Sequence, residues 1–193
     1  HVQGRGVAIH CVTEVELVFA LAALESAGAA KGDRIEHASI AAPGLVERIA
    51  ALDLAVCVQP HFVAERGDAY RRDVEPRHQG DLYRVASLAD AGITLAGGSD
   101  APFGSADPWA AMRAAVQRQT ASGASFGAHE ALSPEAALSL YLADPADLAR
   151  NHLEFVVEDV ERDDPLQPRL IKTLRSKGYL FVGEAAQALG LVE

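Results

Sequence analysis

The stretch RGVAIHCVTEVELVFALAALESAGAAKGDRIEHASI, which begins at residue 5 and ends at residue 40, predicts a strand, a helix and a second strand. Both ends of the stretch are short apolar runs of the length expected for buried strands. Between them, Thr13 and Glu16 have the spacing of a capping box, leucines recur on one helical face, and Gly28 ends the helix. This order predicts two neighbouring parallel strands with a helix packed on them.

The same alternation continues along the chain to about residue 150. Further apolar strands are predicted at residues 54–60 and 93–100, and an arginine-rich loop at residues 64–79. Helices are predicted from Pro43, over residues 82–91 and 108–118, and from Ser133. This α/β pattern of about four strand–helix units fits the C-terminal half of a closed TIM-type (βα)8 barrel, which takes about 250 residues. An open doubly wound sheet is the alternative.

Composition and charge limit the classes of function. The chain has 193 residues, of which 49% are hydrophobic and 23% charged, as in a typical globular domain. Its formal net charge of −10 repels phosphate backbones, so nucleic acid is not an expected partner. No apolar run approaches the roughly 18–20 residues of a membrane helix, and we expect no signal peptide. Cys11 and Cys57 lie in strand-like segments, which predicts reduced, buried thiols in a cytoplasmic protein.

The sequence changes character after about residue 150. Residues 153–157 predict a strand, residues 168–176 a basic helix and residues 179–182 another strand, and none of these continues the earlier spacing. We therefore expect two parts, namely a partial barrel over residues 1–150 and an α+β tail of unassigned origin over residues 151–193.

A polar residue lies near the carboxyl end of each predicted strand, namely His10, His37, Gln59 with His61, and Asp100 in LAGGSDAPFG. In parallel α/β sheets, ligands bind at that edge. Two imidazoles and a carboxylate suit a divalent metal such as zinc. Residues from separate strands converge on one ion when the strands curve round it, which favours the barrel. Taken singly, each histidine also fits a hydrogen-bonded core residue, and Asp100 fits a helix-capping turn.

Several segments are similar, in order, to one enzyme family. They are VAIHCVT (7–13), DRIEHASI (33–40), VCVQPHF (56–62), AGITLAGGSDAPFGSADPWAAMRAAVQRQ (91–119) and LSPEAALSLYLADPA (132–146). Over residues 4–142 the chain resembles the metal-dependent amidohydrolase superfamily, and is closest to its amidohydrolase-3 branch. The resemblance implies that the first four segments carry strands five to eight of the family's barrel.

The resemblance also implies roles for individual residues. His10 and His37 match the family's metal ligands, and Asp100 matches its catalytic aspartate, which also lies at the metal. Gln59 and His61 border the substrate pocket, and glycine at position 98 lets the substrate approach closely. The implied cofactor is a divalent metal, zinc. The implied reaction is hydrolysis of a carbon–nitrogen bond in a small amide or cyclic amide through metal-activated water.

Two features of the family are not matched. Its first-strand His-x-His pair and its fourth-strand lysine or glutamate would lie before His1. The alternative function is therefore a non-catalytic, truncated barrel fragment. Half a barrel leaves two strand edges unpaired, and we expect its inner face to be apolar. Both features predict a homo-oligomer or association with an N-terminal half.

Overall fold

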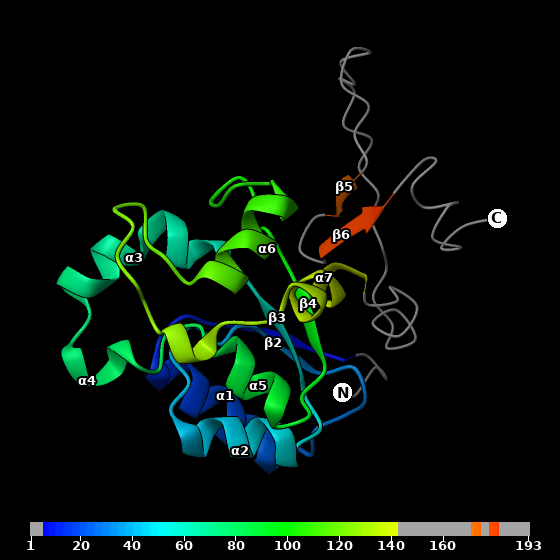
Figure 1. Cartoon of the computed structure of the whole chain (residues 1–193). Helices are drawn as coiled ribbons and strands as arrows, with labels where there is room; N and C mark the ends of the chain where they lie inside the picture. Colours follow the sequence, from blue (N-terminus) through cyan, green and yellow to red (C-terminus); the bar gives the residue numbers. More distant parts are fainter. Residues whose placement is uncertain (1–5, 143–170, 175–177, 182–193) are drawn as a thin grey trace.

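The computed structural model describes residues 6–142, 171–174 and 178–181. A parallel sheet (Figure 1) contains β1 (Ala8–Cys11), β2 (Arg34–His37), β3 (Ala55–Val58) and β4 (Leu95–Gly97). The helices that connect and follow these strands are α1 (Glu14–Ala27), α2 (Pro43–Ala51), α3 (His61–Asp73), α4 (Pro76–Gln79), α5 (Val85–Asp90), α6 (Pro108–Gln117), the 3₁₀ turn η1 (Ala128–Glu130) and α7 (Pro134–Leu142). The predicted strands are confirmed, and each is shorter than the apolar run that predicted it.

The strand order decides between the two predicted folds. Each strand pairs with the next one along the chain, in the order β1-β2-β3-β4, and the direction never reverses. A doubly wound sheet reverses its order at a switch point, whereas the strands of a (βα)8 barrel follow one another in sequence. The sheet therefore has the arrangement of four consecutive units of such a barrel.

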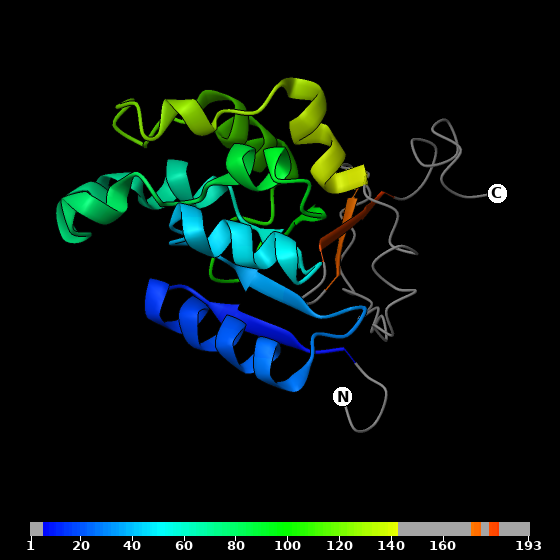
Figure 2. The same ribbon diagram turned by 90° about the horizontal axis from the view of Figure 1, so that it is seen from below.

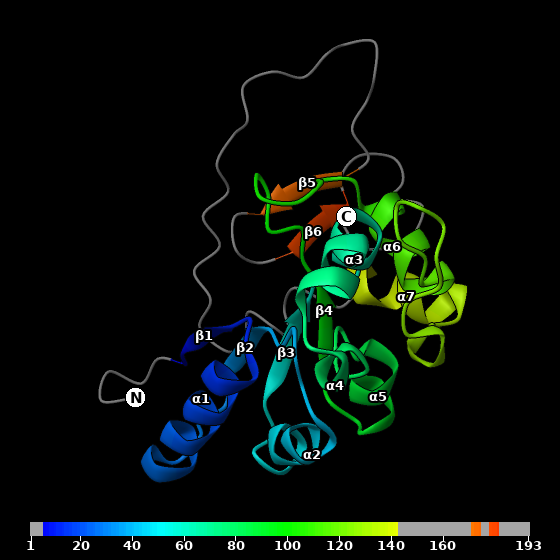
Figure 3. The ribbon, with the colours of Figure 1, turned by 90° about the vertical axis from the view of Figure 1, so that its left-hand side faces the viewer.

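The main core lies between one face of the sheet and the helices, and Figures 2 and 3 show α1 and α2 side by side along the strands. Its fully buried or nearly fully buried members include Cys11, Ile35 and Val56 from the strands and Leu17 and Leu88 from the helices. Burying one leucine stabilises the fold by roughly 1.5–3 kcal/mol relative to leaving it exposed. This layer fixes the strands whose carboxyl ends carry the predicted site.

Helix α1 begins with the predicted capping box. The Thr13 hydroxyl accepts a hydrogen bond from the Glu16 backbone N–H at 3.2 Å. The Glu16 carboxylate accepts from the N–H groups of Val12 and Thr13 at 2.8 Å each, and these bonds lower its pKa. Three donors at the start of the helix are thereby satisfied, which fixes the direction in which α1 leaves β1.

Helix α1 also carries apolar residues on its outer side. Val15 is 62% exposed and Phe19 is 70% exposed, while Leu17 and Leu21 on the inner side are fully buried. Strand β1, which precedes this helix, is an edge strand of the sheet. Among the described strands, none pairs with the outer edge of β1, so the first strand–helix unit presents both an open strand edge and an apolar helix face.

The arginine-rich stretch predicted as a loop is helical, so that prediction is wrong. Residues 61–73 form α3 and residues 76–79 form α4. Phe62 and Val63 are buried in a second core cluster with Leu82, Tyr83 and Phe126. This packing holds α3 in place although its outer side is polar. The helix predicted over residues 82–91 begins only at residue 85, because Tyr83 has a left-handed φ of 51° that an α-helix does not accommodate.

The inner face of the sheet carries charged groups, contrary to the expectation of an apolar face. Alternation along β2 places Arg34 and Glu36 on the side opposite the core residue Ile35. The two side chains form an ion pair and are 8% and 19% exposed. Cys57 lies opposite Glu36 in the sheet register, and burial together with the charge of Glu36 raises the pKa of its thiol. The opposite charges of Arg34 and Glu36 thus offset the cost of placing both side chains in a largely buried position on this face.

The tail predictions meet different outcomes. Residues 178–181 form β6 (Gly178–Phe181), which confirms the strand predicted there. The basic helix predicted over residues 168–176 is wrong, because Ile171–Leu174 forms β5 and pairs with β6 in antiparallel register. Isoleucine and threonine in this segment favour a strand. The strand predicted at residues 153–157 and the boundary predicted at residue 150 lie outside the described residues.

Within the described ranges, no helix combines the length and the apolar character needed to cross a bilayer.

Candidate metal centre

The predicted site residues lie at the carboxyl ends of the strands. Because the strands are parallel, these ends share one edge of the sheet. His10 lies in β1, His37 is the last residue of β2, Gln59 directly follows β3, and His61 is the first residue of α3. Asp100 lies three residues after β4. The fold therefore brings all five to the same end of the sheet.

The rings of His10 and His37 are in direct contact, with centroids 4.6 Å apart and planes at 78°. Strand alternation alone does not give this contact. In the sheet register His10 lies opposite Glu36, whereas His37 lies opposite Cys11, whose side chain belongs to the core under the helices. The backbone of His37 has a φ of 74°, a left-handed conformation that ends the strand and directs the ring towards His10.

His37 is held by a hydrogen bond to Gln59. Its Nδ1 lies 2.8 Å from Oε1 of Gln59, and both side chains are buried. The Gln59 amide nitrogen donates to the carbonyl oxygen of Cys57 at 3.2 Å. Burial lowers the pKa of His37, and the negative charge of Asp100 opposes this shift only in part. His37 is therefore neutral at pH 7, which is the form of imidazole that binds a metal.

His61 ties α3 to the loop that carries Asp100. Its side chain is 1% exposed, and its Nε2 lies 3.1 Å from the carbonyl oxygen of Ser99. Burial lowers the pKa of His61, although the charges of Glu65 and Asp100 oppose the shift. Because a carbonyl can only accept, Nε2 of the neutral ring donates and Nδ1 is unprotonated. Among the described residues, this Nδ1 has no hydrogen-bond partner.

Asp100 lies in a tight turn, and the residue is exposed. Its φ is 51°, and its carbonyl oxygen accepts hydrogen bonds from the N–H groups of Phe103 at 2.8 Å and Gly104 at 3.1 Å. A left-handed conformation at a residue other than glycine costs on the order of 1–3 kcal/mol, and such residues cluster at functional sites. His37 and Asp100 are two of the six non-glycine residues with a positive φ in the described part of the chain.

The loop after Asp100 is fixed to α3 by two charged side chains. Arg66 donates to the carbonyl oxygen of Phe103 at 2.7 Å, and its guanidinium lies 3.8 Å from the centroid of the Phe103 ring. Glu65 accepts a hydrogen bond from the N–H of Ser105 at 3.0 Å. Helix α3, which sequence patterns did not predict, therefore positions the turn that carries Asp100.

Gly98 is buried against two side chains. A Cβ atom at this position would lie 2.8 Å from Sγ of Cys57 and 3.1 Å from Nε2 of Gln59. The absence of a side chain therefore makes room for the Gln59 amide beside β4. The predicted contact of Gly98 with a substrate stays a prediction.

The residues present fit a metal in their chemistry and would supply part of its ligand shell. Neutral imidazole and carboxylate are ligands that zinc accepts. The rings of His10 and His37 are adjacent, and the negative charge of Asp100 acts to raise the pKa of His37. Within residues 6–142, 171–174 and 178–181, no group of three or more His, Cys, Asp or Glu side chains is close enough to hold an ion. The described part of the site is thus a pair of imidazoles with a carboxylate nearby.

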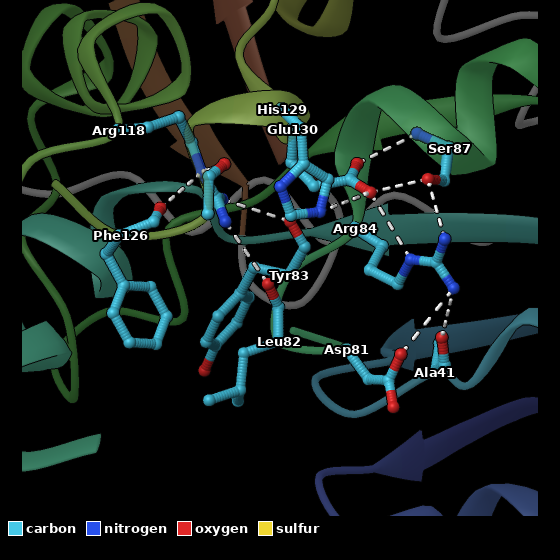
Figure 4. Close-up of polar contacts among 11 residues, drawn as sticks. Ala41, Asp81, Leu82, Tyr83, Arg84, Ser87, Arg118, Phe126, His129 and Glu130 are labelled. Atoms are coloured by element: carbon cyan, nitrogen blue, oxygen red, sulfur yellow. Dashed lines mark hydrogen bonds and ion pairs between the residues drawn. The ribbon is translucent and has the colours of Figure 1, made fainter. Parts of the chain in front are cut away.

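A buried cluster that the sequence did not predict joins the loops around α5 and α6 (Figure 4). Arg118 is 1% exposed and donates to the carbonyl oxygens of Tyr83 at 3.0 Å, Leu82 at 3.2 Å and Phe126 at 3.1 Å. Burial lowers the pKa of Arg118 to about 10, so the side chain stays charged at neutral pH. One guanidinium thus satisfies carbonyl groups from two distant segments.

Glu130 forms the second half of this cluster. It is 1% exposed and accepts hydrogen bonds from the N–H and hydroxyl of Ser87 and from Nε of Arg84 (Figure 4). Burial opposes ionisation, but the bonds from Ser87 and Arg84 outweigh it and lower the pKa of Glu130. No local pattern marks these positions, because arginine and glutamate in loops are usually exposed. The cluster stabilises the scaffold around the site.

Sequence comparisons identify relatives of the chain. Residues 1–152 match the model of the amidohydrolase family. The chain is 30% identical over 151 residues to YtcJ of Bacillus subtilis (strain 168), whose name assigns it provisionally to the amidohydrolases. That match covers 76% of this chain and 28% of YtcJ. The chain is also 34% identical over 115 residues to an N-substituted formamide deformylase of Arthrobacter pascens, with 58% of this chain and 21% of the relative covered.

A solved structure shares both fold and sequence with the chain. An uncharacterized metal-dependent hydrolase from Pyrococcus furiosus matches with a TM-score of 0.64 and 30% identity, over 76% of this chain and 29% of that protein. The chain therefore spans less than a third of the length of each of these relatives. With four parallel strands in barrel order and a family match over most of its length, the chain belongs to the amidohydrolase family of metal-dependent hydrolases.

Proposed function

We propose that the strand-end site serves hydrolysis of a carbon–nitrogen bond, with zinc held by His10 and His37 and with Asp100 as the general base beside the same ion. The observation that carries this proposal is the contact between the two histidine rings at the ends of neighbouring strands. The family match favours this function over that of a non-catalytic fragment.

The chemistry follows from the charge states of the side chains. A bound zinc ion would lower the pKa of a water molecule to about 7. The exposed carboxylate of Asp100 would accept the proton of the attacking water and return it to the leaving nitrogen. His37 stays neutral because it is buried, so it keeps a lone pair for the metal.

The proposed substrate is a small amide. One relative carries the name N-substituted formamide deformylase, which describes cleavage of a formyl group from nitrogen. We take N-substituted formamides as the first substrate class to test. The net charge of −10 supports a small molecule over a nucleic acid as the partner.

We propose that His61, Gln59 and Gly98 border the substrate pocket. The unprotonated Nδ1 of His61 lacks a partner among the described residues, which leaves one hydrogen-bond acceptor unused beside the loop that carries Asp100. Gln59 lies between Gly98 and His37, because its amide nitrogen is next to Gly98 and its amide oxygen faces the His37 ring. Both Gln59 and Gly98 would shape the pocket.

Two further proposals concern location and assembly. Cys11 and Cys57 are both buried and free, which supports a cytoplasmic location. The open edge of β1 and the exposed apolar side of α1 support association with a further strand–helix unit, from a second copy or from an N-terminal half.

The proposed reaction is tested with Asp100→Asn. The chain with added zinc chloride is assayed for release of formate from N-substituted formamides. We expect Asp100→Asn to lower turnover by roughly 10²–10⁴-fold, the usual contribution of general acid–base catalysis. The matched control is Asp107→Asn, because Asp107 caps α6 by accepting from the N–H of Trp109 and asparagine caps equally well.

The control should keep both turnover and melting temperature. Equal turnover in wild type and Asp100→Asn would contradict the proposed base. Unfolding of Asp100→Asn would instead identify the carboxylate as a structural part of the turn. Absence of turnover in the wild-type chain with zinc would contradict the activity proposed for this chain.

A further inference from the structure

The side chain of Gln59 has a defined orientation, because one of its neighbours can only accept hydrogen bonds. The backbone carbonyl of Cys57 lies 3.2 Å from one end of the amide, and that end must be the NH₂ group. The other end, which lies 2.8 Å from Nδ1 of His37, must then be the carbonyl oxygen. The backbone of β3 thus decides which amide atom faces the histidine.

The orientation of the amide in turn decides the protonation of His37. A carbonyl oxygen accepts only, so Nδ1 of His37 must carry the proton that forms this hydrogen bond. A neutral imidazole carries a single ring proton, and the hydrogen bond to Gln59 places it on Nδ1. The remaining nitrogen, Nε2, therefore carries the free lone pair.

We propose that Gln59 is a positioning residue that holds His37 in the Nδ1–H tautomer, so that His37 presents Nε2 to the metal. This inference rests on the proposed function for the identity of the ion, but the tautomer exists without it. A metal-binding histidine commonly donates its other ring N–H to an acceptor that fixes its orientation. In this chain the acceptor is a buried amide anchored on the backbone of the neighbouring strand.

Gly98 helps to keep the Gln59 amide in this position. A Cβ atom there would lie 3.1 Å from Nε2 of Gln59 and 2.8 Å from Sγ of Cys57. Both distances are shorter than ordinary carbon contacts, so a side chain at position 98 would displace the amide. Strand β4 thus contributes to the site by leaving space for Gln59.

The first measurement uses the metal-free chain with ¹⁵N-labelled histidine, with His37 assigned through a His37→Asn variant. Imidazole ¹⁵N chemical shifts distinguish a protonated from an unprotonated ring nitrogen. We expect wild-type His37 to be the Nδ1–H tautomer at pH 7. Gln59→Leu removes the acceptor, so we expect Nε2–H to become a major form. Gln59→Glu keeps an oxygen towards Nδ1 and, with its second oxygen protonated, still donates to the carbonyl of Cys57, so it should retain the proton on Nδ1.

The second measurement is the affinity for Zn²⁺ by titration calorimetry. We expect Gln59→Leu to weaken binding by roughly 10–100-fold, the usual effect of losing such a partner, and Gln59→Glu to restore most of the affinity. The matched control is Gln79→Leu, because Gln79 also donates to backbone carbonyls, those of Val74 and Arg71, and these hydrogen bonds do not involve His10 or His37. It should leave both the tautomer and the affinity unchanged.

The outcomes separate this inference from the proposed function. An Nε2–H tautomer in wild type, or an unchanged tautomer in Gln59→Leu, would overturn the inference whether or not zinc binds. Absence of zinc binding in wild type, with the expected tautomers, would contradict the zinc site alone. If Gln59→Leu does not fold, Gly98→Ala replaces it, and an unchanged His37 spectrum in that variant would likewise count against the role of Gln59.

Discussion

At the scale of single residues, one backbone angle at His37 brings two strands' histidines together. Because His37 lies opposite Cys11 in the sheet register, the alternation of side chains along β2 would direct it into the core. The left-handed φ of 74° directs it towards His10 instead. The residue types of the site were predictable, since polar groups at strand ends are visible in sequence. The hydrogen bond from His37 to Gln59 was not, because it depends on strand register and on a backbone conformation that sequence patterns do not encode.

The contact between the histidines predicts an effect of zinc on stability. An ion bound only by the folded chain adds RT ln(1 + [L]/Kd), which is about 1.4 kcal/mol at ten times Kd. We expect ZnCl₂ to raise the melting temperature of wild type and to have no effect on His10→Ala. His129→Ala is the control, because His129 is 65% exposed. An equal zinc shift in His10→Ala and wild type would exclude His10 as a ligand.

The buried histidines also predict a pH dependence of stability without metal. Burial lowers the pKa of His37 and His61 below the ordinary value of 6.5. As the pH falls, these two histidines therefore take up protons more readily in the unfolded chain than in the folded chain. The contribution of these histidines to the free energy of unfolding should therefore be greatest above pH 6.5, and the free energy of unfolding should decrease as the pH falls towards 5. His61→Gln keeps a donor for Ser99 but cannot titrate, so the decrease should become smaller.

The control for this measurement is His129→Gln, in which an exposed histidine is replaced in the same way. It should show the same decrease as wild type in denaturant titrations at a series of pH values. A His61→Gln variant with the full wild-type decrease would show that His61 titrates normally in the folded chain.

At the scale of secondary-structure elements, the close packing of α7 on β4 depends on Gly97. A Cβ atom there would lie 2.4 Å from the Tyr141 ring of α7. We expect Gly97→Ala to destabilise the chain by about 1–3 kcal/mol, the cost of overpacking. The control is Gly44→Ala in α2, where a Cβ would meet nothing within 4 Å and stability should rise slightly. Equal stability of both variants in urea titrations would contradict this packing.

Elements were predictable where local chemistry decides them. The capping box of Thr13, the Asp107–Pro108 start of α6 and the glycine after α1 all mark their helices correctly. Helix α3 was missed because its buried residues, Phe62 and Val63, stand at its beginning and a run of charged residues follows. Its stability comes from partners such as Phe126, which are distant in sequence. Tertiary packing of this kind is invisible to a local pattern.

At the scale of the whole molecule, the exposed side of the first strand–helix unit predicts association. Phe19 is 70% exposed on α1, the helix that follows the edge strand β1. We expect wild type to sediment as a dimer or larger species at micromolar concentration and Phe19→Lys to shift the distribution towards monomer. Trp109→Lys is the control, because Trp109 is 51% exposed on α6. A monomer at every concentration would contradict the prediction.

The whole fold was only partly predictable. Alternating strands and helices indicated a parallel sheet, but they fit a barrel segment and a doubly wound sheet equally well. The difference lies in strand order, which no local pattern specifies. The ion pair of Arg34 and Glu36 on the inner face was missed for a related reason, because the side of β2 that faces the helices is set by the neighbouring strands.

The sequential strand order has a consequence for how the chain folds during synthesis. Each new strand pairs with the strand made just before it, so its partner has already left the ribosome when it appears. Closing each unit requires bringing together segments separated by one connecting stretch, and loop-closure cost rises only by about 0.6 kcal/mol per doubling of length. These four strands can therefore pair one after another in the order of synthesis, from β1 to β4.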